Sequence, residues 1–311
     1  MAAEAAPTCA CCGGPRWRPA YAAVGHRFER CLDCGFVRMA DPPDDGAVDA
    51  QYVEDEAHGL LAFQEQAQDL PRFDEMLRRV EAVVPPGRLL DVGCSIGTSL
   101  EAARARGWDA VGLELSRPVA EWARRERGLD VRPVRLEEAG FAPGSFDAVL
   151  MHHTLEHLAR PDEVVARCRA LLRSGGAMYQ ALPDHASLKG LLFGEHWTYG
   201  VVPQHLSHFT RRTLGMLLRR AGLRVVRTWT RTASRDPHLL ISAMARLGRM
   251  DLLLRWCGTP AGFDQEAYVR LMTDRPWARM VSQRLWPAAL VRWLGLGEDL
   301  HVLAVRDGTL E

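Results

Sequence analysis

The sequence carries no net charge and almost no lysine. Acidic and basic side chains number 39 each, and Lys189 is the only lysine among the basic residues. Because a balanced chain produces no global electrostatic field, we expect no nucleic-acid partner. The preference for arginine indicates a compositional bias of the coding sequence rather than arginine-specific chemistry.

Long apolar runs are absent as well. No uncharged apolar stretch reaches the ~18 residues that a membrane-spanning helix needs. The first residues lack the basic start and apolar block of a signal peptide. We therefore expect a cytoplasmic protein with no transmembrane segment. No internal repeat of about 20 to 50 residues and no low-complexity tract is present.

Cysteine, by contrast, is concentrated near the start of the chain. Cys9 and Cys12 form one C-x-x-C pair, and Cys31 and Cys34 form a second pair after 18 intervening residues. Each pair is followed by glycine, which accepts the positive φ of a sharp turn. This pattern predicts a structural Zn²⁺ site, because four thiolates close the tetrahedron. The alternative is two unrelated reduced turns. The other cysteines are interpreted as bystanders or small apolar residues: Cys11, Cys94, Cys168 and Cys257.

Strand-like and helix-like segments alternate from residue 88 onward, which predicts an α/β fold. We expect a Rossmann-like, mostly parallel sheet with helices on both faces. Its seven strands are predicted at 88–93, 109–115, 130–136, 145–153, 177–183, 223–230 and 299–305, and helices are predicted at 63–84, 98–107, 116–128, 161–176 and 211–221. The predicted units are a zinc-binding module (1–40), a linker and leading helix (41–85), the α/β core (86–233), a helical insert or cap (234–297), and the last core strand with a tail (298–311).

A glycine-containing loop follows the first core strand in LLDVGCSIG, residues 89–97. Gly93 and Gly97 lie in a strand-to-helix turn, where a ligand packing against the backbone excludes side chains. Glu114 closes the next strand, where a carboxylate can accept both hydroxyls of a ribose. The glycines are four residues apart, unlike the G-x-G-x-x-G of dinucleotide sites, and Asp91 would repel a pyrophosphate. The loop therefore favours a cationic nucleoside.

Asp91, Gly93, Ser95 and Gly97 match the acid and G-x-G-x-G motif of the class I S-adenosylmethionine-dependent methyltransferases, with Ser95 at the usual middle glycine. On these residues, and on Glu114 as the ribose-binding acid, the chain resembles that family. The blocks FDAVLMHHTLEHLARPDEVV and LLRSGGAMYQALPD are similar to the segments around its fourth and fifth strands. The cysteine pairs and the helical insert are typical of one bacterial subgroup.

The resemblance implies S-adenosyl-L-methionine as cofactor, with Leu115, Glu137 and His152 also lining its site. It implies methyl transfer to a small polar acceptor, most simply to an oxygen of a sugar, glycan or natural product. Two alternatives stay open. One is carbon or nitrogen methylation of a nucleotide-linked sugar, and the other is a non-catalytic module that binds a cofactor or a partner chain.

The segment HHTLEHL, residues 152–158, follows the fourth core strand and lies at the ligand-binding edge of the sheet. Glu156 and His157 could simply shape the loop through backbone hydrogen bonds. They also resemble the E-x-x-E-H magnesium motif of RNA 3′-end methyltransferases, but His153 replaces the first glutamate. Because Mg²⁺ prefers oxygen ligands, we expect no magnesium requirement. In a third interpretation, His153 or His157 acts as a base or holds the acceptor.

His205, in the segment PQHLSHFT after the fifth strand, is the predicted catalytic base. Sugar C-methyltransferases that have a similar cysteine module carry Tyr-x-Glu-His at a comparable position. In this sequence the corresponding residues are Val202-Pro203-Gln204-His205. The loss of tyrosine and glutamate disfavours carbon methylation, whereas one imidazole suffices for a hydroxyl proton. Alternatively, His205 only caps the helix that begins near Thr210.

The segment 234–297 is helix-like, carries four tryptophans, and has nine arginines against five acids. It is interpreted as a cap over the substrate pocket. The alternative is peripheral contact with a membrane surface, which Pro287 disfavours because it would kink an amphipathic helix. The sequence does not indicate the oligomeric state.

Overall fold

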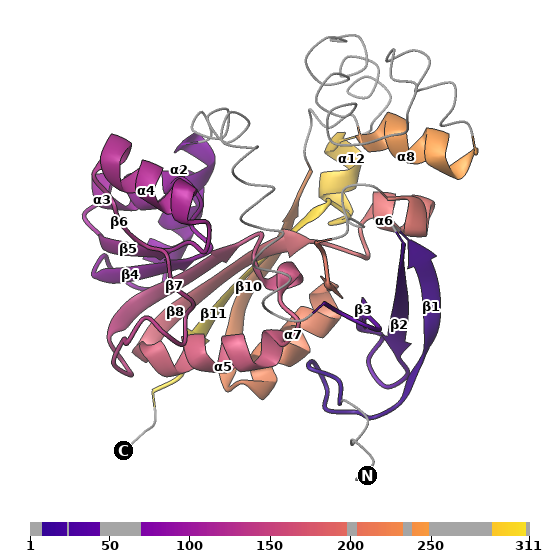
Figure 1. The fold of residues 1–311 in the computed structure, drawn as a ribbon, viewed down its shortest axis with the longest axis horizontal. Coiled ribbons are helices and arrows are strands. Elements are labelled where there is room, and N and C mark those ends of the chain that lie inside the picture. Colours follow the sequence, from indigo (N-terminus) through magenta and orange to yellow (C-terminus); the bar gives the residue numbers. More distant parts are fainter. Residues whose placement is uncertain are drawn as a thin grey trace.

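The computed structural model contains two β-sheets with helices packed around them (Figure 1). It describes residues 8–23, 25–43, 70–197, 204–232, 238–248 and 288–308. The larger sheet has the strand order β10-β11-β8-β7-β4-β5-β6. Its strands are β4 (Arg88–Val92), β5 (Asp109–Leu113), β6 (Asp130–Arg132), β7 (Phe146–His152), β8 (Leu172–Pro183), β10 (Leu223–Arg231) and β11 (Asp299–Arg306).

This sheet is mostly parallel, as predicted. Strands β6, β5, β4, β7 and β8 pair in parallel, while β11 runs antiparallel to both β8 and β10. The chain order reverses between β4 and β7, since β5 and β6 lie on one side and β8 on the other. Open α/β sheets bind ligands at such a reversal, beyond the carboxyl ends of the strands.

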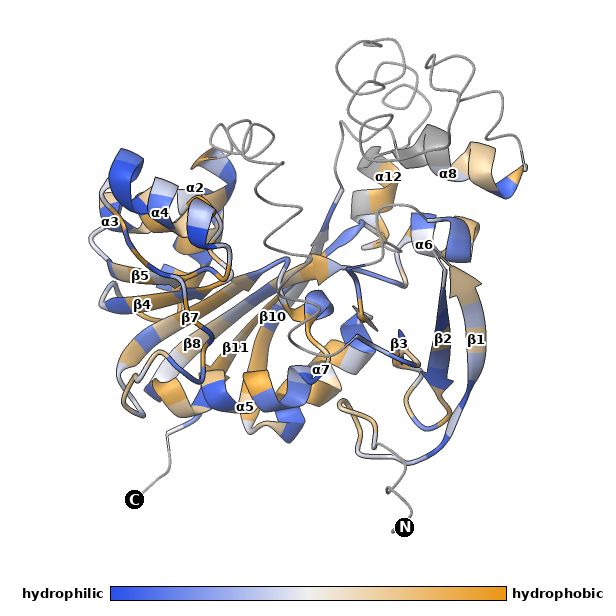
Figure 2. Cartoon of the chain, in the orientation of Figure 1, coloured by the Kyte–Doolittle hydropathy of each residue, from blue (hydrophilic) through white to orange (hydrophobic). Residues whose placement is uncertain are grey.

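Helices cover both faces of the larger sheet because its central strands are apolar on both sides. Leu89 belongs to one buried cluster and Leu90 to another, as alternation along a strand requires. One cluster includes residues of α2 (Leu70–Glu81), α3 (Thr98–Ala105) and α4 (Arg117–Arg127). The other includes residues of α5 (Pro161–Leu171) and α7 (Arg211–Arg220). Figure 2 shows apolar residues concentrated along the strands and the helix faces turned toward them.

Two helix boundaries differ from the sequence prediction. The helix expected over 161–176 ends at Leu171, and β8 begins at Leu172, which pairs with Phe146. Gly176 therefore lies in a strand, where an added Cβ would approach the carbonyl oxygens of Arg173 and Asp147 at 3.0 and 3.1 Å. The leading helix ends at Glu81 rather than residue 84, and its expected part before residue 70 lies outside the described residues.

The cysteine module, residues 8–43, builds the smaller sheet together with a strand from far along the chain. Strands β1 (Trp17–Ala23), β2 (His26–Cys31) and β3 (Val37–Met39) are antiparallel. Strand β9 (Ser207–His208) completes the sheet by pairing with β3, so that Val37 faces His208. Helix α7 also contacts the module, because Arg220 donates to the carbonyl oxygens of Cys9 and Ala10 at 3.0 and 3.2 Å. The module is thus joined to the core at two places.

Only the ends of the predicted insert are described, as α8 (His238–Arg246) and α12 (Ala288–Trp293). Most of segment 234–297, with three of its four tryptophans, lies outside the described residues, so its role as a cap stays a prediction. Helix α6 (Leu188–Phe193) packs against α8. Within the described parts of the chain, no helix combines the length and apolar character that membrane crossing requires.

Candidate active site and cysteine cluster

The loop between β4 and α3 needs glycine at two positions. Gly93 and Gly97 both have φ of 78°. An added Cβ on Gly93 would lie 2.4 Å from the Thr154 hydroxyl oxygen, and one on Gly97 would lie 2.4 Å from Leu129. Ser95, at the place of the usual middle glycine, also adopts a left-handed conformation with φ of 48°. The backbone therefore keeps the glycine-loop path despite the serine.

Glu114 ties this loop to the one after β5. Its two carboxylate oxygens accept the backbone N–H groups of Ser95 and Ser116, each at 2.9 Å. Sequence reasoning assigned Glu114 to ribose hydroxyls, and in this structure the carboxylate joins the loops after β4 and β5. Each carboxylate oxygen has a second lone pair, which leaves capacity for a ribose hydroxyl.

Asp91 is a buried carboxyl at the end of β4. The Ser99 hydroxyl donates to its Oδ2, while Oδ1 has no hydrogen-bond partner among the described residues. Burial raises the pKa of Asp91 to about 7, and the neighbouring charge of Glu114 acts in the same direction. A cation beside Oδ1 would relieve both effects, so the position fits a positively charged ligand group.

The remaining predicted cofactor residues are more scattered. Leu115 is half-buried next to Glu114. Glu137 is exposed in the loop after β6 and lies 4.0 Å from Arg135. The ring of His152 lies 5.2 Å from that of Phe73 on α2, and burial lowers the pKa of His152 well below 6.5. The first two positions flank the loops after β5 and β6, whereas His152 packs toward α2.

A histidine–carboxylate pair follows β7. His153 has φ of 53°, and its Nδ1 lies 3.1 Å from Glu156, which belongs to the short 3-10 helix η2 (Leu155–His157). Burial alone would lower the pKa of His153, but the hydrogen bond to Glu156 and the charge of Asp299 outweigh it and raise the pKa. Burial would likewise raise the pKa of Glu156, yet His153 and the nearby histidines lower it. Glu156 is therefore an ionised carboxylate at neutral pH.

His205 lies beside this carboxylate although it is 49 positions further along the chain. Ligand atoms of Glu156, His157 and His205 lie within 4.8 Å of one another, and the two imidazole rings are 4.7 Å apart. Nδ1 of His157 donates to the Gln204 carbonyl at 3.0 Å, and burial lowers the pKa of His157 to about 3. So low a pKa makes His157 a weak base. The backbone contact also agrees with a loop-shaping role for this residue.

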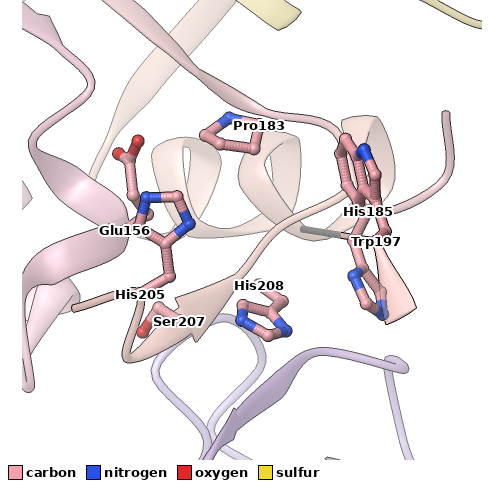
Figure 3. A pocket seen from close by; sticks show the side chains of 7 residues that line it. All are labelled: Glu156, Pro183, His185, Trp197, His205, Ser207 and His208. Atoms are coloured by element: carbon pink, nitrogen blue, oxygen red, sulfur yellow. The ribbon is translucent and has the colours of Figure 1, made fainter. Parts of the chain in front are cut away.

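The helix-capping alternative for His205 is wrong. Thr210 is the N-cap of α7, and its side chain forms a reciprocal capping box with Thr213. His205 instead lines a narrow hollow at the carboxyl end of β8, of about 180 Å³ including space open to solvent. Figure 3 shows Glu156 and His205 on one side of this hollow, His185 and Trp197 on the other, and His208 between them.

The four predicted zinc ligands converge. Cys9 Sγ lies 3.5 Å from Cys34 Sγ, Cys12 Sγ lies 3.6 Å from Cys31 Sγ, and all four sulfurs are within 4.8 Å of one another. A tetrahedron with Zn–S bonds of ~2.3 Å has S–S edges of ~3.8 Å, so the donor set fits Zn²⁺.

The glycines after the two cysteine pairs have φ of 76° and 84°, and their N–H groups donate to Cys9 O and Cys31 O at 2.7 and 2.9 Å. Cys11 is buried outside the cluster of four, as are Cys94 and Cys168, and these three are free thiols. Cys257 lies outside the described residues.

Sequence reasoning missed several polar residues that the fold brings here. His185 lies two residues after the end of β8, so a polar side chain near the carboxyl end of a predicted strand was a usable signal. Asp299 opens β11 and lies 3.6 Å from His153 Nε2. Tyr21 of the cysteine module is hydrogen-bonded to His208, which lines the hollow, and no local pattern predicts the β3–β9 pairing that brings the two residues together.

Comparisons with known proteins agree with this geometry. A family model described as a methyltransferase domain matches residues 63–228, more than half of the chain. The ubiquinone biosynthesis O-methyltransferase of Chromobacterium violaceum is 32% identical over 148 residues, 44% of this chain and 64% of that protein. The protein of the same name from Dechloromonas aromatica is 30% identical over 163 residues, 50% of this chain and 66% of that protein. The chain thus matches just under two thirds of the length of these relatives.

Solved structures share the fold at lower identity. A SAM-dependent methyltransferase from Archaeoglobus fulgidus aligns with a TM-score of 0.51 and 18% identity, over 79% of this chain and 99% of that one. Phosphoethanolamine N-methyltransferase 2 of Haemonchus contortus, solved with S-adenosyl-L-methionine, gives a TM-score of 0.51 at 18% identity, over 76% of this chain and 53% of that one. The match to the family model, together with the sheet order and the glycine loop, shows that the chain belongs to the methyltransferase domain family.

Proposed function

We propose that the chain transfers a methyl group to a hydroxyl oxygen of a small polar acceptor, with His205 as the general base. The observation that carries this proposal is that His205 lies within 4.8 Å of the buried, ionised Glu156 at the edge of the hollow. When bound, the cofactor would supply an electrophilic methyl group on a sulfonium. The protein then has to orient the acceptor and remove its proton.

The cofactor would be held by the loops after β4 and β5. Asp91 Oδ1 would accept a hydrogen bond from an ammonium group, and the backbone at Gly93 and Ser95 would lie against the ligand. Glu114 would bind the ribose while continuing to hold both loops. Leu115, Glu137 and His152 are kept as further candidates around the same ligand.

His205 would take the acceptor proton on its imidazole and become an imidazolium. Glu156 would stabilise that charge, because an ionised carboxylate nearby favours the protonated imidazole. His153 keeps Glu156 ionised in the buried site through the 3.1 Å contact. The three residues would thus form a chain in which only His205 exchanges a proton with the acceptor.

Oxygen is favoured over carbon and nitrogen as the methylated atom. The relatives from C. violaceum and D. aromatica are both named O-methyltransferases. In addition, the tyrosine and glutamate that precede the histidine in similar sugar C-methyltransferases are absent, since Val202 and Gln204 replace them. A sugar or natural-product hydroxyl fits a hollow that is lined by Glu156 and three histidines. A hydroxyl of a ubiquinone precursor is the second candidate, because the relatives carry that name.

The test is transfer of isotope-labelled methyl from S-adenosylmethionine to a panel of free sugars, nucleotide sugars, phenols and quinols. Mass spectrometry and NMR of the product locate the label. We expect an O-methyl ether from at least one acceptor class. Label on carbon or nitrogen would contradict the proposal, and a product only from quinols would select the second candidate.

We also propose that Cys9, Cys12, Cys31 and Cys34 hold one structural Zn²⁺. The sulfur distances and the two glycine turns support it. Four thiolates occupy every position of the tetrahedron, so this ion would have no substrate-binding role.

A further inference from the structure

Tyr21, on β1 of the cysteine module, contacts a histidine of the hollow. Its hydroxyl is hydrogen-bonded to Nδ1 of His208, and the two rings are stacked with centroids 6.1 Å apart. Phe28 of β2 stacks on the same imidazole at 4.8 Å. The β3–β9 pairing fixes the backbone of His208, whose exposed fraction is only 4%. The module therefore holds this side chain from two sides, and its ribbon passes next to His208 in Figure 3.

This hydrogen bond determines which nitrogen of His208 carries the proton. Burial lowers the pKa of His208 well below 6.5, and His185 and His205 act in the same direction, so the ring is neutral. Burial raises the pKa of Tyr21, so the phenol keeps its proton. A phenol is a stronger acid than the N–H of a neutral imidazole, and Tyr21 is therefore the donor. Nδ1 accepts, and Nε2 carries the hydrogen.

The Nε2 of His208 has no hydrogen-bond partner among the described residues, although it is buried and its ring lines the hollow. A buried N–H without a partner costs about 1–3 kcal/mol unless a ligand or water satisfies it. The hollow is narrow, because its volume of about 180 Å³ includes space open to solvent. We therefore expect the Nε2–H to meet a single functional group of the acceptor rather than the complete molecule.

We propose that the cysteine module completes the acceptor site, and that Tyr21 is a positioning residue that makes His208 present its Nε2–H to an oxygen of the acceptor. Because the ionised Glu156 lines the same hollow, a neutral oxygen such as a hydroxyl, ether or carbonyl is favoured over a carboxylate. This inference rests on the proposed function only in assigning the hollow to the acceptor.

The first experiment measures the tautomer of His208 without any substrate. Long-range ¹H–¹⁵N spectra of the full-length, S-adenosylhomocysteine-loaded protein report the protonated nitrogen, and His208→Gln assigns the signal. We expect the Nε2–H form in the wild type and a mixture of both tautomers in Tyr21→Phe, which keeps the stacked ring. The matched control is Tyr179→Phe, because the Tyr179 hydroxyl is bonded to Nδ1 of His301 inside the larger sheet. The Tyr179→Phe control should alter the tautomer of His301 and leave the tautomer of His208 unchanged.

The second experiment uses phenol as a probe of a neutral oxygen and benzylamine as a cationic probe of similar size. Phenol should shift the His208 Nε2–H signal saturably, and Tyr21→Phe should weaken its binding roughly two- to tenfold, the worth of one neutral hydrogen bond. Benzylamine should leave the signal unshifted.

Either of two results overturns the inference: an Nδ1–H tautomer in the wild type, or a His208 signal that phenol or Tyr21→Phe leaves unchanged. Neither experiment needs turnover. If no acceptor of the panel is methylated while the His208 signals behave as expected, that result would count against the proposed function alone.

Discussion

The clearest quantitative prediction concerns Asp91 and the pH dependence of cofactor binding. Its carboxyl has a pKa of about 7, raised from 3.8 by burial. We expect S-adenosylhomocysteine to bind the ionised form, because the ammonium group of the ligand would lie at Asp91 Oδ1. The ionised fraction rises from ~0.1 at pH 6 to ~0.9 at pH 8, so the Kd should fall about tenfold over this interval.

The substitution Asp91→Asn removes the charge and keeps a group that can accept the Ser99 hydrogen bond. A hydrogen bond to a charged group contributes about 1.5–3 kcal/mol, so the Kd at pH 8 should rise roughly 10- to 150-fold. The variant should also lose the pH dependence between pH 6 and 8. Titration calorimetry at several pH values measures both effects.

Stability of the unliganded protein should change in the opposite sense. The folded carboxyl keeps its proton up to about pH 7, whereas the unfolded one loses it near 3.8. Between these values the folded state binds more protons, so the free energy of unfolding falls as pH rises. Asp91→Asn removes the titrating carboxyl, and with it this fall in the free energy of unfolding. At pH 8 the unliganded variant should therefore melt higher than the wild type while binding the cofactor more weakly.

Asp147→Asn is the matched control. Asp147 lies near the start of β7, at the opposite edge of the sheet, where it accepts the Arg88 N–H at 2.7 Å. The Asp147→Asn substitution should leave the Kd for S-adenosylhomocysteine and its pH dependence unchanged. A wild-type Kd that is constant between pH 6 and 8, or an Asp91→Asn variant that binds normally, would refute the assignment of the ammonium group to Asp91.

Three further predictions test the base and the metals. His205→Ala should lower turnover by roughly 10²–10⁴-fold with little change in cofactor affinity. Near-normal turnover would move the role of base to His153, because the pKa of His157 is lowered to about 3. Brief treatment with EDTA should leave methyl transfer intact, whereas full loss restored by magnesium would show that the cluster around His205 holds an essential metal ion. Elemental analysis should find one zinc per chain in the wild type and in the matched control Cys11→Ser, but none in Cys31→Ser. The melting temperature of Cys31→Ser should also fall. A wild-type protein that contains no zinc after expression with added zinc would refute the site.

The core was predictable because its signals are local. In RLLDV and the glycine loop after it, ten consecutive residues show the apolar pattern of a buried strand, the glycines of a tight turn and the carboxylate of a ligand site. The same holds for the cysteine turns, where the spacing and the following glycine specify the geometry.

The acceptor side of the site was less predictable because distant segments build it. His205 was predicted to be the base from its neighbours in sequence, but its position beside Glu156 depends on the packing of the segment after β8 against η2. The loss of the expected helix over 172–176 has a similar cause. Pairing of Leu172 with Phe146 outweighs the local helical pattern.

The pairing of β3 with β9 also sets an order for folding during synthesis. The cysteine turns can close as soon as residue 35 has been made, but β3 lacks its outer partner until residue 208 emerges. At about 5–20 residues per second, translation leaves that strand edge open for roughly 10 to 35 s. An open edge can pair with another chain. Nascent chains stalled before β9 should therefore associate through β3, and the wall around His208 cannot form until β9 has been made.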